Sequence, residues 1–232
     1  MILTVDIGNS NIVLGGVEGD TIAFEARLRT DATKTSDEYC IDLKMILDVY
    51  GVAPKVIEGT IIASVVPQVL NSMQTAVKKL TGKDSLVVGS VAALREHKPP
   101  LIVIDMGTAT TMIVLDETGA LIGGCICPGV KISLDALTER TALLPGLQLD
   151  QPKKAIGRNT IDCMRSGIMM GNAAMIDGMV ERMEAELGRK TTVIATGGIA
   201  RFVIPMCKTP IVYDKDLLVK GLAALYRDNK RN

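Results

Sequence analysis

The sequence predicts an α/β fold made by duplication, with a cleft between its two halves. Two stretches show the same order of residue types, and their aspartates, Asp6 and Asp105, lie 99 positions apart. In each stretch an apolar, β-branched run ends in Asp-x-Gly, small polar residues follow, and a second apolar run begins. Strand-like and helix-like patterns then alternate in both halves, which is typical of an α/β domain.

Composition excludes several classes of protein. The chain has 232 residues, is 47% hydrophobic and has a formal net charge of zero, so it can build a large core without a basic surface for nucleic acid. Aromatic residues make up only 3%, too few for base-stacking platforms. We expect no membrane span, since no apolar run approaches ~18 uncharged residues. Five cysteines without a disulfide framework, and an N-terminal strand that contains Asp6, favour a cytoplasmic protein.

In the first half, strands are expected at residues 2–8, 11–17, 21–29, 57–65 and 85–88. A helix begins after Thr35, because Thr35 and Glu38 form a capping box, and it stops at Gly51. A second helix runs from Pro67, a residue suited to the first turn, to about residue 80.

The second half repeats this plan. Strands are expected at residues 101–104, 111–115, 121–126 and 191–195, and helices at about 132–143, 160–187, 199–203 and 215–226. Asn159 is the expected N-cap of residues 160–187, which form one helix or two. The predicted domains are therefore residues 1–97, with the first hairpin, and residues 98–232, with the second hairpin and the long helix.

The two hairpins are candidate phosphate-binding loops. In the first, Gly8 permits close backbone approach, and Asn9, Ser10 and Asn11 offer donors. Asp6 only accepts hydrogen bonds when ionised, so it needs a cation, for which hydrated Mg²⁺ fits. An ordinary hairpin with a polar turn is the alternative.

The second hairpin offers hydroxyls at Thr108, Thr110 and Thr111, although threonine also suits a strand. Asp105 follows four apolar residues, so its charge should be paired or bound to an ion.

A third element, Ala195–Ala200, leads from a strand through Gly197 and Gly198 into a helix. Paired glycines let a flat ring or a ribose approach the backbone, and a helix N-terminus favours anions. The two hairpins, followed along the chain by the glycine pair, resemble motifs of the superfamily of acetate kinases, sugar kinases, Hsp70 and actin. The hairpins correspond to its two phosphate loops, and the glycine pair corresponds to its adenosine loop. The resemblance implies two ribonuclease H-like (actin-like ATPase) domains.

A narrower resemblance runs nearly end to end. The sequence is similar to type III pantothenate kinases in a series of motifs: Asp6–Asn11, Thr35–Tyr39, Ala63–Pro67, Asp105–Thr111, Gly123–Gly129, Ser133–Leu137, Thr141–Pro145, Ile156–Thr160, Met164–Gly167 and Ala195–Gly198. It implies phosphorylation of pantothenate by ATP to 4'-phosphopantothenate, the first step of coenzyme A biosynthesis.

The resemblance also implies roles for residues. Asp105 would bind a monovalent cation (K⁺ or NH₄⁺), Thr108 would contact ATP, and Thr160 would contact pantothenate. The ATP phosphate loop would consist of Asp6, Ile7, Gly8, Asn9, Ser10, Asn11, Ile12 and Val13.

One family segment is missing. Members carry a Gly-x-Asp motif, whose Asp is the proposed catalytic base, between a Val-Val-Gly strand and the helix before the second hairpin. Here Val87–Gly89 runs directly into Ser90–Arg95, so no catalytic base is named. Either this sequence omits residues of the natural protein, which we favour because the flanking elements are intact, or a true deletion leaves a catalytically silent ATP-binding or regulatory protein of the same fold.

Gly167 and Gly171 lie on the long predicted helix among several methionines. Small residues there suit either core packing or a close contact between subunits. The family resemblance favours a homodimer, because these kinases build their substrate site at the subunit interface.

Overall fold

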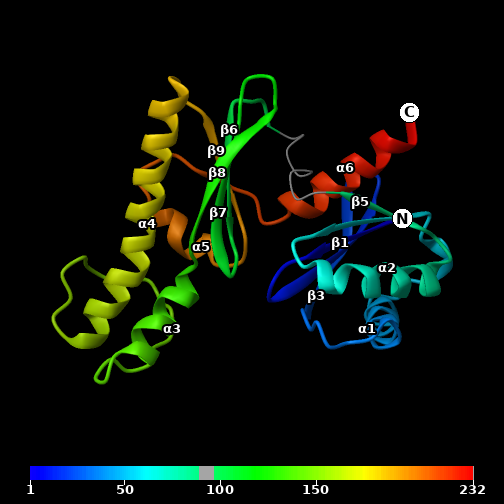
Figure 1. Cartoon of the computed structure of the whole chain (residues 1–232), viewed down its shortest axis with the longest axis horizontal. Coiled ribbons are helices and arrows are strands. Elements are labelled where there is room, and N and C mark those ends of the chain that lie inside the picture. The colour runs from blue at the N-terminus through cyan, green and yellow to red at the C-terminus, as the bar shows by residue number, and fades with distance from the viewer. Residues whose placement is uncertain (89–96, 232) are drawn as a thin grey trace. The chain divides into compact units, whose positions relative to one another are not determined.

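The structure, a computed structural model, describes residues 1–88 and 97–231 (Figure 1). The chain divides into two compact units, one formed by Met1–Glu96 with Asp216–Asn232 and the other by His97–Lys215. Each unit contains one five-stranded sheet with both parallel and antiparallel neighbours.

The first sheet has the strand order β3-β2-β1-β4-β5. Its strands are β1 (Ile2–Ile7), β2 (Asn11–Glu18), β3 (Thr21–Arg29), β4 (Gly59–Ser64) and β5 (Ser85–Val88). Strands β1, β2 and β3 form an antiparallel meander, and β4 and β5 join β1 in parallel. All five strands predicted from the sequence are present.

Helices cover both faces of this sheet (Figure 1). The first unit contains α1 (Ser36–Val49), the 3-10 turn η1 (Pro54–Val56), α2 (Pro67–Thr81) and α6 (Leu217–Arg231). Leu3, Val5 and Ile7 of β1 pack in the core that α1 and α2 complete, whereas Ile2 packs with Leu222 of α6. This follows from strand geometry, in which successive side chains point to opposite faces.

Local signals set the starts and ends of these helices. The Thr35 hydroxyl accepts a hydrogen bond from the Glu38 N–H at 3.3 Å, and the Glu38 carboxylate accepts one from the Thr35 N–H at 2.8 Å. This confirms the predicted capping box. Pro67 stands in the first turn of α2, and Gly51 takes a left-handed φ of 68° after α1.

The last helix differs from the expectation. The sequence predicted that residues 98–232 would form one half, but α6 packs on the sheet of the first unit. Gly59 of β4 makes this possible, because a Cβ at this position would collide with the ring of Tyr226. The apolar face of a helix can be read from its sequence, but the sheet that it covers depends on such distant partners.

The second sheet has the strand order β10-β9-β6-β7-β8. Its strands are β6 (Leu101–Met106), β7 (Ala109–Leu115), β8 (Leu121–Pro128), β9 (Thr192–Thr196) and β10 (Val212–Tyr213). Four of them were predicted; the two-residue β10 was not, because so short a strand has no detectable periodicity.

The helices of the second unit are α3 (Val130–Arg140), α4 (Thr160–Leu187), α5 (Ala200–Val203) and the 3-10 turn η3 (Ile204–Met206). Ile102, Ile104 and Met106 of β6 share a core with α4. Residues 160–187 form a single helix, and the Asn159 side chain accepts a hydrogen bond from the Asp162 N–H at 2.9 Å, as its predicted N-cap role requires.

The two sheets repeat the same strand order and closely similar hairpin registers. Asp6 pairs with Val13 across the first hairpin, and Asp105 pairs with Thr111 across the second. In each hairpin, the pairing between the second and third strands shifts its register three residues after the partner of the aspartate. The shift begins at Gly16 in the first sheet and at Val114 in the second. The duplicated α/β fold class predicted from the sequence is confirmed.

In the described residues, five cysteines are free thiols. None of the helices formed by residues 1–88 and 97–231 is both long enough and apolar enough to span a bilayer.

Candidate active site

The first hairpin loop consists of Gly8, Asn9 and Ser10, between β1 and β2. The Gly8 N–H donates to the Asn11 carbonyl at 3.0 Å and closes the turn. Asn9, Ser10 and Asn11 are exposed, whereas Ile7 and Ile12 are buried in the core. The two isoleucines therefore anchor the loop and can offer a ligand only their backbone, while the three polar residues face solvent.

Thr30, the residue directly after β3, holds this loop. Its hydroxyl donates to the Gly8 carbonyl at 2.6 Å, and its N–H donates to the Ser10 carbonyl at 3.0 Å. The sequence pattern does not predict this role of Thr30, because nothing local reveals that the end of β3 meets a loop about twenty residues earlier.

Asp6 and Val13, the outer members of the predicted ATP loop, are half-buried partners on β1 and β2. Asp6 alternates with Val5 and Ile7, so its side chain points away from the core under α1 and α2. Asp105 has the same position in the second sheet, between Ile104 and Met106, which pack toward α4.

The second hairpin loop is one residue shorter and consists of Gly107 and Thr108. The Gly107 N–H donates to the Ala109 carbonyl at 3.0 Å, as Gly8 does in the first loop. Thr108 is exposed and able to meet a ligand. Thr110 is fully buried on the α4 side of the sheet, so the sequence-based suggestion of a phosphate-binding hydroxyl there is wrong; Thr111 lies beside Asp105 instead.

Asp105 is an unbalanced negative charge. Its side chain keeps an exposed face, but burial by surrounding atoms raises the pKa of its carboxyl from 3.8 to about 6. Among residues 1–88 and 97–231, no group pairs with this carboxylate. A carboxylate that has lost part of its hydration without gaining a protein donor suits a bound cation.

Two glycines bring neighbouring loops against the second hairpin. Gly129 follows β8, and a Cβ there would collide with the Thr108 carbonyl. Gly197 follows β9 with a left-handed φ of 99°, and a Cβ there would collide with the Met106 backbone. The predicted glycine pair thus lies beside the end of β6, and the Tyr213 hydroxyl donates to the Gly197 carbonyl at 3.4 Å.

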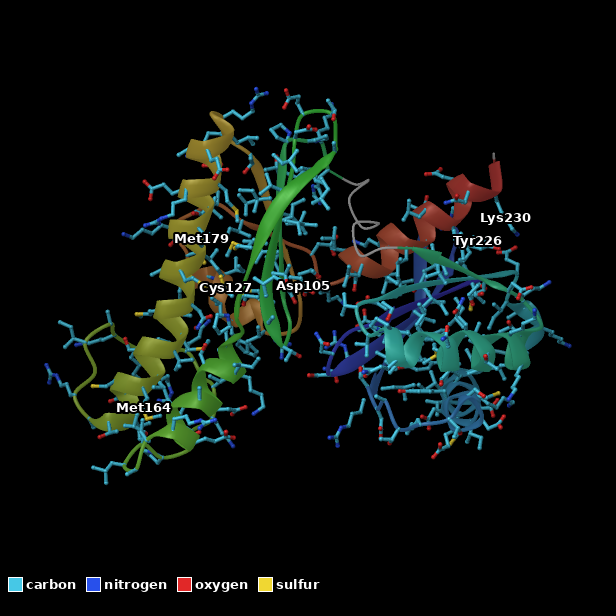
Figure 2. The ribbon with its side chains drawn as sticks, viewed as in Figure 1. Asp105, Cys127, Met164, Met179, Tyr226 and Lys230 are labelled. Atoms are coloured by element: carbon cyan, nitrogen blue, oxygen red, sulfur yellow. The ribbon has the colours of Figure 1, made fainter. Side chains whose placement is uncertain are left out.

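Thr160, the predicted pantothenate contact, is exposed in the first turn of α4. Met164 lies on α4, one turn after Thr160. Figure 2 shows Met164 well separated from Asp105, which is on β6 near the end of that strand. One copy of the unit therefore does not bring Thr160 to the second hairpin.

The seam of the missing family segment, at Gly89-Ser90, lies outside the described residues. Within the described ranges, no cluster of three or more His, Cys, Asp or Glu side chains could hold a metal ion. A cation at Asp105 would consequently need backbone carbonyls, water or ligand oxygens to complete its shell.

Known structures show the class of fold. The chain resembles a component of (R)-2-hydroxyglutaryl-CoA dehydratase from Acidaminococcus fermentans, with 15% identity, a TM-score of 0.63, and coverage of 97% of this chain and 96% of that one. It also resembles a ROK hexokinase from Thermus thermophilus, with 11% identity, a TM-score of 0.56, and coverage of 98% and 99%. The fold is the duplicated α/β architecture of the actin-like ATPases and sugar kinases.

Sequence relatives narrow this class. The family model for type III pantothenate kinase matches residues 2–93 and 78–182. Type III pantothenate kinases from Exiguobacterium sp. and Rhizorhabdus wittichii are 38% and 40% identical to the chain, covering 100% and 97% of both partners. The chain belongs to the type III pantothenate kinase family.

The comparisons also bear on the missing segment. The Exiguobacterium alignment spans 255 positions, 23 more than the chain has residues. The family model matches in two segments that overlap at residues 78–93, around the predicted seam. This chain therefore lacks residues that its relatives have, as predicted from its sequence.

Proposed function

We propose that the protein transfers a phosphoryl group from ATP to pantothenate and forms 4'-phosphopantothenate, the first step of coenzyme A biosynthesis. The observation that carries this proposal is the match along the whole chain to relatives named for this activity. The repeated architecture of the two hairpins, with an aspartate one residue before the end of each first strand, supports it.

ATP would bind at three backbone elements. The first hairpin, Asp6–Val13, offers the exposed polar groups of Asn9, Ser10 and Asn11 to the phosphates. Thr108 would contact the nucleotide from the second hairpin. The turn at Gly197 and Gly198 would accept the adenosine, since Gly198 is exposed and a residue without a side chain lets a flat ligand approach the backbone.

Two cations would neutralise charge during transfer. Asp105 would bind a monovalent cation, K⁺ or NH₄⁺, as the resemblance to type III pantothenate kinases implies, and its carboxylate has no partner in the described chain. Asp6 would orient water on the Mg²⁺ that accompanies ATP, since Mg²⁺ usually keeps several waters beside substrate phosphates. The carboxylates would hold these ions where charge develops on the transferred group.

The pantothenate site would require a homodimer. Thr160 is in the first turn of α4, one turn before Met164, and Figure 2 shows Met164 well separated from Asp105, so a second subunit could supply Thr160 to the nucleotide. Gly167 and Gly171 are exposed on α4, with nothing within 4 Å of a Cβ at either position. Such a smooth helix surface would allow another helix to approach closely.

Phosphoryl transfer depends mainly on positioning and electrostatic stabilisation. A general base contributes about 10²–10⁴-fold in addition. Because the family segment with the proposed base is absent, we name no base, and the hairpins and cations remain the proposed source of catalysis. We place the reaction in the cytoplasm, where five free thiols stay reduced.

The test is product identification. The purified chain is incubated with ATP, MgCl₂, KCl and pantothenate, and 4'-phosphopantothenate is measured by mass spectrometry. Asp6→Asn should lower turnover, because it removes the indirect Mg²⁺ contact. Unchanged turnover of this variant at saturating Mg²⁺ would refute the role of Asp6.

A further inference from the structure

Thr30 makes two hydrogen bonds to the first hairpin loop, and both partners are backbone carbonyls. Its side-chain Oγ1 donates to Gly8 at 2.6 Å, and its backbone N–H donates to Ser10 at 3.0 Å. Thr30 is half-buried and follows β3 directly, so its own position is fixed by the sheet. All three residues belong to the first unit.

These bonds determine which way the loop amides face. In a trans peptide, the carbonyl of one residue and the N–H of the next point in opposite directions. Drawing the Gly8 and Ser10 carbonyls toward Thr30 therefore turns the N–H groups of Asn9 and Asn11 away from it. A phosphate is attracted by such N–H groups and repelled by carbonyl oxygens.

Asn9 is ready to meet a ligand. It is exposed, and within residues 1–88 and 97–231 it forms no hydrogen bond. A loop with an unsatisfied exposed amide and two fixed carbonyls is preorganised, so a bound anion does not have to reorient it.

In the second copy of the fold, the residue after the third strand also contacts the hairpin loop, but through its backbone. The residue after its third strand is Gly129, whose backbone packs against the carbonyls of Gly107 and Thr108. Contact between the end of the third strand and the hairpin loop is thus a feature of both copies. In the first copy, the residue after the third strand makes this contact with a side-chain donor, the Thr30 hydroxyl.

We infer that Thr30 is a positioning residue, which holds the first hairpin loop with its N–H groups directed at the phosphates of ATP. The inference rests on the proposed function in that it takes this loop as the ATP phosphate loop. The Thr30 hydroxyl touches neither phosphate nor substrate; it acts through the Gly8 peptide.

The test compares Thr30→Val, which keeps the branched shape but removes the hydroxyl, with Thr30→Ser, which keeps the hydroxyl. Calorimetry with MgATP should show about tenfold weaker binding for T30V, the loss expected for one hydrogen bond that orients a binding group. T30S should stay within about twofold of the wild type. The KM for ATP should rise in T30V while the KM for pantothenate stays unchanged.

Thr33→Val is the matched control. The Thr33 hydroxyl also makes a 2.6 Å hydrogen bond, but to the Asp31 side chain on the surface. This variant should bind MgATP like the wild type, so a T30V effect cannot be attributed to loss of any nearby threonine hydroxyl.

The inference is overturned if T30V binds MgATP as the wild type does, or if T30S is as weak as T30V. These binding results stand apart from the proposed function. A wild-type chain that binds MgATP but forms no phosphopantothenate refutes the kinase proposal alone, and the T30V comparison still decides the role of Thr30. A wild-type chain that binds no MgATP overturns both.

Discussion

At the scale of single residues, the sequence predicted that Asp105 is a site residue, but it could not predict how strongly the surrounding atoms bury its charge. Its position after four apolar residues predicted a charge that needs a partner, and the structure shows a carboxylate whose pKa is raised to about 6. Thr110 and Thr111 show the limit. Alternation places them on opposite faces, but only the packing of α4 reveals that Thr110 is the buried one.

Asp105→Asn should change how stability depends on pH. The pKa of the Asp105 carboxyl in the folded protein, about 6, lies above the ordinary value of 3.8. Between these two pH values the folded state therefore keeps a proton on Asp105 that the unfolded state has released. Stability of the wild type is therefore lost as pH rises through this window, and the Asn variant escapes this loss. Thermal unfolding without K⁺ should show equal midpoints below pH 4 and a higher midpoint for the variant above pH 6.

Potassium ions should affect the thermal stability of the wild type and of Asp105→Asn differently. KCl should raise the unfolding midpoint of the wild type at neutral pH and leave that of Asp105→Asn nearly unchanged, because only the carboxylate attracts the cation. Choline chloride at the same ionic strength is the control for general salt effects. Equal stabilisation of both proteins by KCl would contradict a cation site at Asp105.

At the scale of elements, the sequence predicted the ends of helices wherever the capping residue lies next to the helix. The capping box at Thr35, the proline at the start of α2 and the cap at Asn159 each lie within a few residues of the helix end that they define. The placement of α6 was not predictable in this way, since it depends on Gly59, a residue far away in sequence.

Gly59→Ala tests how α6 is held on the first sheet. The added methyl would collide with the ring of Tyr226, so the ring or the helix must shift. We expect a loss of about 1–3 kcal/mol in the free energy of unfolding, measured by urea denaturation. Gly146→Ala is the matched control, because nothing lies within 4 Å of a Cβ at that position. Similar stability of both variants would mean that Tyr226 does not pack on Gly59.

At the scale of the whole molecule, the duplication could be read from two Asp-x-Gly motifs, and the register of both sheets confirms it. The cleft between the halves stays a prediction. So does the homodimer, for which the exposed small residues of α4 are the structural support.

Gly171→Leu tests that dimer. The position is exposed and open within one chain, so leucine should not destabilise the unit itself. Across a close helix contact it would prevent approach, and sedimentation velocity should show a shift from dimer to monomer with a higher KM for pantothenate. Ala185→Leu, at another exposed position of α4, is the control. A dimer that survives Gly171→Leu places the interface elsewhere.

The central claim is that this chain, despite lacking a segment present in its relatives, is a pantothenate kinase. The most direct measurement is ADP release by the purified 232-residue chain with MgATP and KCl, with and without pantothenate. The account predicts turnover that depends on pantothenate and yields one 4'-phosphopantothenate per ADP. Binding of MgATP without pantothenate-dependent ADP release would contradict it and would instead indicate a nucleotide-binding protein that has lost the kinase reaction.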